Sequence, residues 1–510
     1  GVFVAVVLGV IFVVWRKLPA GFLPEEDQGY VMVMVSTPEA SSLQVTRQAM
    51  ADADAVIRTL PEVASTSFAA GFNMMAGIAS TSSGIIFVKL VDYSDRRLSA
   101  MQIAQRLTGE LYVAVPGAEC YAFIPPSIPG LGVTSGVSVE VQDLEGRGTA
   151  YLMENAGRLM DSLRKNPAIA SVTTQFDAGV PQRRLRIDKQ QALAAGVDLG
   201  TLYGELTTLL GGAYINNFTR FGKLYQTYIQ AAPDYRLDRR SLDSYYVTSA
   251  SGESVPVASL IDVADTVGVE YVSQFNLYRS VSLTVTPAAR ASTTTVMREI
   301  TATAAETLPD DIGTAWSGTS YQEANASKTG GLVYALALVF VFLALAALYE
   351  SWGLPLAILM SVPVAVLGAV LFVGGTHLMN SLYLNDIYMQ ISLVMLIGLA
   401  AKNAILVVEY ADRLFREQGV SLMDAAIGAA KLRVRPIIMT AFAFILGVMP
   451  LVFASGVYAT ARNIMGVALV GGMLFATLLG IFVYPALYYF VGKIGRFEQR
   501  RELKKQEENA

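Results

Sequence analysis

The chain has 510 residues, of which 53% are hydrophobic and 16% are charged, and its net charge is −4. In soluble domains about a quarter of the residues are usually charged. The lower charged fraction of this chain therefore excludes an ordinary soluble protein and favours a membrane protein. No segment resembles a nucleic-acid-binding patch, so we expect no nucleic-acid partner. The chain has one cysteine, Cys120, and one histidine, His377. These counts exclude an internal disulfide and a zinc or copper site of His and Cys, and we expect no cofactor.

The first fifteen residues, GVFVAVVLGVIFVVW, are apolar throughout. A signal peptide is the alternative interpretation, but the segment has no Met start, no basic leader and no small-residue cleavage site. We therefore expect residues 1–18 to be part of a transmembrane helix whose beginning is absent.

Residues from about 20 to 330 carry alternating strand and helix patterns instead of long apolar runs. Their order, strand-helix-strand-strand-helix-strand, is that of a ferredoxin-like split unit, and it occurs twice. The elements of the first copy are expected at 30–36, 41–60, 63–70, 84–92, 98–113 and 118–124. Those of the second copy are expected at 136–143, 147–164, 168–176, 280–288, 292–307 and 311–317.

The second copy is interrupted by about a hundred residues, which we interpret as an inserted subdomain. It contains a turn-rich segment, LGGAYINNFTRFG (210–222), and a hairpin signal, SASGESVP (249–256). The predicted fold class is a membrane α-helical bundle with an α+β domain made of two ferredoxin-like β-α-β sandwiches, the second one interrupted. The expected subdomains are 22–132 for the first, 133–177 with 279–325 for the second, and 178–278 for the insertion.

The C-terminal third is dominated by apolar runs, each close to the ~20 residues that span a bilayer as a helix. Basic residues gather at 411–435 and after 492, and such clusters favour the cytoplasmic side. The large domain then lies on the other side of the inner membrane, in the periplasm of a Gram-negative cell. The runs are at about 331–348, 353–375, 388–409, 436–456 and 464–492, giving five transmembrane helices over 330–492 and a basic tail over 493–510.

Lys402 lies near the middle of the apolar stretch GLAAKNAILVV. Its nearest acidic residue, Glu409, is seven residues away, roughly 10 Å along a helix. A charged ammonium at membrane depth is costly and usually marks an ion or proton path, although a lysine can also extend to the interface. We expect Lys402 to need a carboxylate from another polypeptide or from a segment not included here.

Six motifs, taken together and in order, resemble the resistance-nodulation-division family, specifically its hydrophobe/amphiphile efflux branch of Acr- and Mex-type multidrug pumps. The similarity runs along the whole chain and covers the C-terminal half of such a permease, starting inside its seventh transmembrane helix. The motifs are FLPEEDQG (22–29), PPSIPGLG (125–132), SYQE (320–323), ALYESW (347–352), GLAAKNAILVVEYA (398–411) and LRVRPIIMTAFAFILGVMPL (432–451).

The resemblance implies half of a proton-driven antiporter that exports small amphiphilic drugs across the inner membrane. It implies a homotrimer in membrane lipid, a periplasmic adaptor, an outer-membrane channel and an N-terminal half of the permease that carries two adjacent aspartates. The two sandwiches would be porter-type subdomains, and the insertion a docking subdomain. By motif, Lys402, Arg433 and Thr440 correspond to proton-relay residues, and Asn403 lies beside the lysine.

The stretch GFNMMAGIASTSSG (71–84) has few charges and several small residues, which predicts a flexible loop. It matches the gating loop that separates two substrate pockets in the family. Aromatic residues on flanking strands match pocket residues, although core packing is the alternative interpretation. Polarizable Met and flat aromatic surfaces suit promiscuous apolar binding. The expected substrate-binding residues are Phe72, Met74, Phe87, Tyr121 and Phe123.

Other functions compete with this interpretation. A membrane-anchored enzyme would need a catalytic constellation within 20–330, yet that region has no histidine, and we expect the chain not to be an enzyme. A non-transporting scaffold would have no use for Lys402. An exporter of lipids, siderophores or metals is the alternative within transport.

Overall fold

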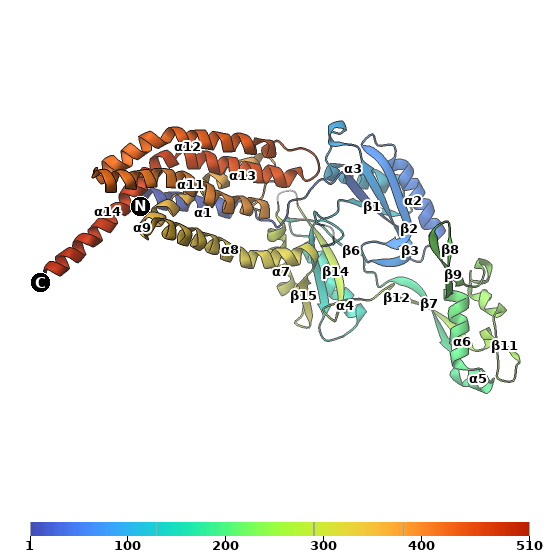
Figure 1. Ribbon diagram of the computed structural model, residues 1–510. Coiled ribbons are helices and arrows are strands. Elements are labelled where there is room, and N and C mark those ends of the chain that lie inside the picture. The colour runs from blue at the N-terminus through green and yellow to red at the C-terminus, as the bar shows by residue number, and fades with distance from the viewer. Residues whose placement is uncertain (1, 129, 289–290, 381, 509–510) are drawn as a thin grey trace. The chain divides into compact units, whose positions relative to one another are not determined.

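The computed structural model describes residues 2–128, 130–288, 291–380 and 382–508 (Figure 1). The chain combines long apolar helices with short strands and the helices that cover them. The principal helices are α1 (Val2–Lys17), α2 (Leu43–Ile57), α3 (Ala100–Ala114), α4 (Thr149–Leu163), α5 (Lys189–Ala194), α6 (Leu199–Leu206), α7 (Thr293–Thr307), α8 (Gly318–Tyr349), α9 (Gly353–Leu359), α10 (Val362–Met379), α11 (Ile387–Gln418), α12 (Leu422–Val452), α13 (Ala459–Leu478) and α14 (Gly480–Glu508). The strands are β1 (Tyr30–Ser36), β2 (Val63–Asn73), β3 (Ile78–Leu90), β4 (Glu119–Phe123), β5 (Val137–Asp143), β6 (Ile169–Thr174), β7 (Val180–Ile187), β8 (Ala213–Arg220), β9 (Lys223–Ile229), β10 (Tyr246–Thr248), β11 (Ser254–Pro256), β12 (Ile261–Gly268), β13 (Ser273–Phe275), β14 (Tyr278–Pro287) and β15 (Ile312–Trp316).

The first sheet has the strand order β2-β3-β1-β4, and α2 and α3 cover one of its faces. The side-chain pattern of the central strand β1 explains why the helices pack against only one face. Its valines, Val31, Val33 and Val35, are fully buried beneath α2 and α3, because successive side chains of a strand point to opposite faces. The methionines between them, Met32 and Met34, therefore lie on the face without helices.

The second sheet repeats this connectivity with β6, β14, β5 and β15, and β13 pairs with the other end of β14. Its central strand β5 alternates in the same way. Val137, Val139 and Val141 are fully buried, and α4 and α7 contact this strand. The side chains of Ser138 and Glu140 consequently face away from the two helices, toward the open side of the sheet.

The expected flexible loop over residues 71–84 is wrong, because these residues form the end of β2, a tight turn and the start of β3. Phe72 pairs with Ala79, and the turn is closed by the Ala76 amide, which donates to the Asn73 side chain at 3.0 Å. Gly84 has a packing role instead. A Cβ on Gly84 would lie 2.2 Å from the sulfur of the buried Met50 on α2, so a larger residue here would force the Met50 side chain to move.

A second compact unit covers Asp177–Tyr271. Its core gathers apolar residues of α5, α6, β10 and the β7–β12 ladder. The predicted hairpin over 249–256 is present as β10 and β11. Most of the segment 210–222, expected to be turn-rich, forms β8 (Ala213–Arg220), which pairs with β9 through a turn at Phe221 and Gly222. Aromatic pairs across this hairpin, Tyr214–Tyr228 and Phe218–Tyr225, explain the strand preference.

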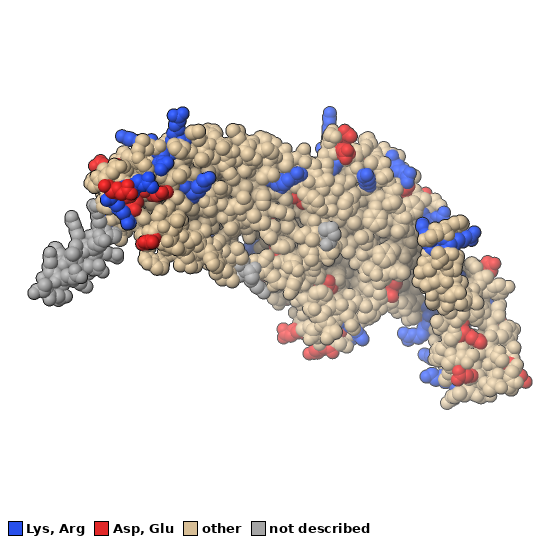
Figure 2. Space-filling model, in the orientation of Figure 1, with Lys and Arg blue, Asp and Glu red and all other residues tan. Residues whose placement is uncertain are grey.

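Five helical segments in the described part of the chain are long and apolar enough to cross a membrane. The face drawn in Figure 2 shows few charged side chains along the middle of these helices. Several boundaries differ from expectation. The helices α8, α11 and α12 extend beyond the expected apolar runs, and the runs at 353–375 and 464–492 are each divided, between α9 and α10 and between α13 and α14. The segments are Gly331–Tyr349, Gly353–Met379, Ile387–Gln418, Leu422–Val452 and Ala459–Leu478. The side chains of the predicted basic tail beyond Ile494 lie outside the described residues.

The linker at 22–29 connects the helices to the first sheet through two adjacent carboxylates. Glu26 accepts hydrogen bonds from the amides of Thr460 (3.2 Å) and Ala461 (2.6 Å) at the start of α13. Asp27 forms a partly buried ion pair with Arg96 at 2.8 Å and accepts a hydrogen bond from the Ala100 amide at the start of α3. Burial would raise the pKa of Asp27, but these donors outweigh it and lower that pKa. Anionic side chains are stabilised at helix N-termini, so the linker is anchored to both helices.

Candidate functional site

Apolar and aromatic side chains lie in a row on the face of the first sheet that α2 and α3 do not cover. Met32 of β1 is paired with Phe87 of β3 on one side and with Phe123 of β4 on the other. Two residues further along, Met34 is paired in the same way with Ile85 and Tyr121. Residues paired across antiparallel strands share a face, so these side chains form a continuous surface, which we call the methionine–aromatic surface.

Three residues predicted from the sequence therefore lie together on this surface. The rings of Tyr121 and Phe123 stack with centroids 5.8 Å apart. Phe123 is almost completely buried, whereas Phe87 and Tyr121 are each more than a third exposed. Burial raises the pKa of the Tyr121 hydroxyl, as expected for a phenol held against an apolar surface.

The two remaining predicted residues, Met74 and Phe72, lie near the β2–β3 turn. Met74 packs against the cluster of Met32, Met34, Ile85 and Phe123, and it therefore extends the methionine–aromatic surface. Phe72 lies near the tip of the hairpin and is 40% exposed. Met32 and Met34 were not among the predicted site residues, although their alternation with valine in YVMVMVS is the signal that places both on one face.

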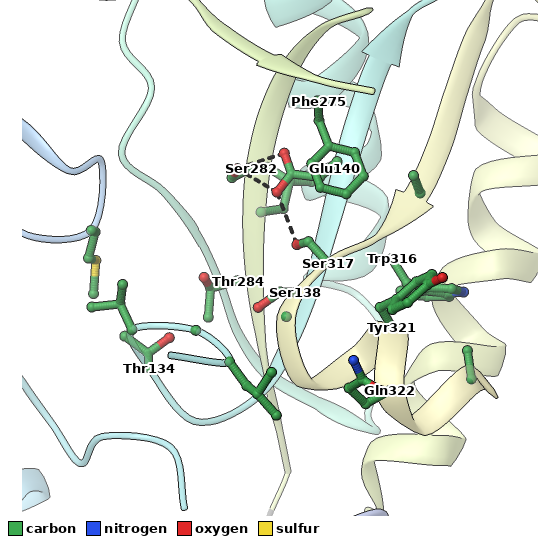
Figure 3. A pocket seen from close by; sticks show the side chains of 18 of the residues that line it. Thr134, Ser138, Glu140, Phe275, Ser282, Thr284, Trp316, Ser317, Tyr321 and Gln322 are labelled. Atoms are coloured by element: carbon green, nitrogen blue, oxygen red, sulfur yellow. Dashed lines mark hydrogen bonds between the residues drawn. The ribbon is translucent and has the colours of Figure 1, made fainter. Parts of the chain in front are cut away.

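A cavity of about 810 Å³ adjoins this surface (Figure 3). It shares Met75 and Val133 with the methionine–aromatic surface. Residues of β5, β14 and β15 in the second sheet, together with the start of α8, supply much of the remaining wall. Its volume lies within the roughly 300–1,000 Å³ that small-molecule pockets occupy. The cavity therefore combines an apolar side with a side built from the open face of the second sheet.

Glu140 is the charged residue on that second side, and it was not predicted. Its side chain is 6% exposed and lines the cavity. The Ser282 hydroxyl lies 2.7 Å from both carboxylate oxygens, and the Ser317 hydroxyl donates to one of them at 3.0 Å. The period-two pattern VSVEVQ at 137–142 could have placed Glu140 on the open face, but it could not show that a cavity lies there.

Lys402 occupies the middle of α11 and has an exposed side chain. No described carboxylate forms an ion pair with it. The nearest acidic residues on the same helix are engaged elsewhere: Glu409 pairs with Arg413 at 3.6 Å, and Asp412 pairs with Arg416 at 2.8 Å. Neighbouring Asn403 is 1% exposed, and its amide forms no hydrogen bond of normal geometry within the described residues.

Arg433 and Thr440 lie on α12, which packs against α11. The guanidinium of Arg433 lies 4.8 Å from the ring centre of Tyr410. Tyr410 is eight residues from Lys402, roughly 12 Å along α11, so the structure does not bring Arg433 to the lysine. Thr440 donates its hydroxyl to the Ile437 carbonyl at 3.0 Å. It lies seven residues beyond Arg433 on α12, roughly 10 Å along the axis.

The helices and the site define a membrane protein with a sheet-rich domain that contains an amphiphilic cavity. A family model described as the AcrB/AcrD/AcrF family matches residues 1–492. The chain belongs to this family, which confirms the expected membership of the resistance-nodulation-division pumps.

Several curated proteins are similar along almost the whole chain. The toluene efflux pump membrane transporter TtgB of Pseudomonas putida is 37% identical over 492 residues, covering 96% of this chain and 46% of that protein. The multidrug resistance protein MdtF of Escherichia coli is 33% identical over 485 residues, covering 94% of this chain and 46% of that protein. The chain thus spans about half the length of these relatives, whose names describe transport and not catalysis.

Proposed function

We propose that this chain forms half of a proton-driven inner-membrane transporter that exports amphiphilic compounds by drug/proton antiport. The proposal rests mainly on Lys402. This exposed lysine lies in the middle of a helix long enough to cross a membrane, and it has no anionic partner among the described residues. The relatives are named as multidrug, toluene and solvent efflux pump transporters, which supports this substrate class.

In the proposed mechanism, Lys402 pairs with a carboxylate of the other half of the permease. When a proton neutralises that carboxylate, the ion pair is lost and the helices around α11 repack. The membrane potential contributes about 2.3 kcal/mol per charge per 100 mV to such a step. Arg433, Thr440 and Asn403 would support the relay. Arg433 would act from the level of Tyr410, and Asn403 through its buried amide beside the lysine.

The proposed substrate region is the methionine–aromatic surface together with the adjoining cavity. Phe72, Met74, Phe87, Tyr121 and Phe123 would contact the apolar parts of substrates. The equal connectivity of the two sheets supports their assignment as ferredoxin-like porter-type subdomains, over 22–132 and over 133–177 with 279–325. The inserted residues 178–278 would be a docking subdomain, with the whole domain in the periplasm.

The proposed assembly contains more than this chain. The N-terminal half of the permease would supply the carboxylates, three permeases would form a trimer, and a periplasmic adaptor and an outer-membrane channel would complete the export path. Residues 330–492 would provide five transmembrane helices, residues 1–18 part of another, and residues 493–510 a cytoplasmic tail. An exporter of lipids, siderophores or metals remains the alternative.

The experiment that tests the function replaces Lys402 in a permease assembled from this chain and its other half. Lys402→Met should abolish resistance to amphiphilic drugs while expression and trimer formation persist, because only the proton-coupled step needs the charge. Lys431→Met on α12 is the matched control, since Lys431 is also an exposed lysine of a membrane-capable helix. Full resistance with Lys402→Met would contradict the proposed coupling.

A further inference from the structure

Glu140 is an acidic residue in a cavity whose described lining residues offer it no opposite charge. Its carboxylate lies on the open face of β5, opposite the buried valines, and is held by the hydroxyls of Ser282 and Ser317 (Figure 3). Two hydroxyl groups donate two protons, whereas a carboxylate has about four acceptor positions. Hydrogen-bonding capacity therefore remains on a group that is 6% exposed.

The residues that line the cavity in the described part of the chain include no Lys, Arg or His. A buried ionised carboxylate is costly unless a positive charge compensates for it. The protein itself provides hydroxyl groups but no cation among these described lining residues. A bound cation would supply the compensating charge, whereas a bound anion would add like-charge repulsion.

The remaining walls fit the rest of such a ligand. Phe275, Trp316 and Tyr321 present aromatic rings, and Met75 joins the cavity to the methionine–aromatic surface. Aromatic faces attract cations, and methionine side chains adapt to apolar bodies of different shapes. The charged head and the apolar body of such a ligand would thus each contact complementary groups, on different walls of the cavity.

We propose that Glu140 selects cationic amphiphiles: the positively charged head lies at its carboxylate, and the apolar body lies toward Met75 and the methionine–aromatic surface. This inference rests on the proposed function and assigns a charge preference to its substrate region. Ser282 and Ser317 act as positioning residues, since they fix the carboxylate from β14 and from the residue that precedes α8.

The test measures binding of two probes to the purified 510-residue chain in a neutral detergent: tetraphenylphosphonium, a cation, and N-phenyl-1-naphthylamine, a neutral aromatic compound. Glu140→Gln retains the shape of the side chain and removes its charge. It should weaken tetraphenylphosphonium binding by about tenfold or more and leave the neutral probe unaffected. Glu140→Asp should retain part of the preference for the cation. Glu145→Gln is the matched control, because the Glu145 side chain is 60% exposed.

Retention of the neutral probe shows that the variants are folded. Equal tetraphenylphosphonium affinity in the native chain and Glu140→Gln would overturn the inference, as would an equal loss of both probes, which would make Glu140 purely structural. Absence of tetraphenylphosphonium binding to the native chain would overturn it as well. These outcomes leave the proposed function open, because that proposal is tested separately by Lys402→Met, which should preserve binding of both probes.

Discussion

Asp386 is a fully buried carboxylate directly before α11, the helix that carries Lys402. One oxygen accepts a hydrogen bond from the Met389 amide at 2.8 Å, and the other has no partner in the described part of the chain. Burial raises the pKa of Asp386 to about 7, with a further contribution from nearby Glu26, and the amide bond opposes this rise. A carboxylate in this environment favours its protonated form.

The raised pKa predicts how stability depends on pH. The folded chain binds a proton at Asp386 that the unfolded chain has already lost, so this contribution is complete below pH 4 and disappears as pH rises through about 7. The full difference is at most roughly 4 kcal/mol. Asp386→Asn should reduce the fall in melting temperature between pH 5 and pH 8, measured in detergent, because asparagine can still cap α11. Asp424→Asn, at an exposed position at the start of α12, is the control, and an unchanged slope in Asp386→Asn would refute the prediction.

Some of these single residues can be identified from the sequence, and others cannot. Lys402 can be identified because one charge interrupts an apolar run, and Phe87, Tyr121 and Phe123 can be placed on strands. Glu140 cannot be recognised as a cavity residue, because the cavity exists only where several segments far apart in the chain meet, among them those near Met75, Ser282 and Tyr321. A pattern within one strand contains no information about what faces it.

At the scale of elements, α13 is packed closely against its neighbours through small residues. A Cβ on Gly472 would lie 2.3 Å from the Leu396 side chain of α11 and 3.1 Å from the Ala365 carbonyl of α10. Ala468 and Ala476, one turn to either side, are buried. Small residues at this spacing allow helix backbones to approach one another in a membrane.

Gly472→Ala should therefore destabilise the helical bundle by about 1–3 kcal/mol, because the added methyl group forces Leu396 or a helix to move. Thermal unfolding of the purified chain in detergent would measure this loss. Gly398→Ala in α11 is the matched control, since a Cβ there would meet nothing within 4 Å. Equal melting temperatures for the two variants would show that the helices are not in close contact at Gly472.

The elements of both sheets can be predicted from sequence, because alternating valines in β1 and β5 specify which face meets the helices. The β2–β3 hairpin cannot, because its Gly, Ala and Ser residues resemble a loop when only local composition is considered. The reason for Gly84 is a tertiary contact, because the side chain of Met50 on α2 fills the space that a Cβ would occupy. Strand β8 is similar, because its aromatic residues are supported by partners on β9.

At the scale of the whole molecule, the chain carries two separate chemical features. The sheet-rich part contains an amphiphilic cavity lined by the buried carboxylate of Glu140, and the helical part contains Lys402, a mid-helix lysine with no anionic partner among the described residues. We propose that they are the substrate side and the proton side of one exporter. The coupling depends on a carboxylate that the described residues do not present to Lys402.

The most direct measurement is substrate export driven by a pH gradient in proteoliposomes. The account predicts no gradient-driven export by this chain alone, export when the N-terminal half of its permease is added, and loss of that export with Lys402→Met while probe binding persists. Gradient-driven export by the chain alone, or undiminished export with Lys402→Met, would contradict the account.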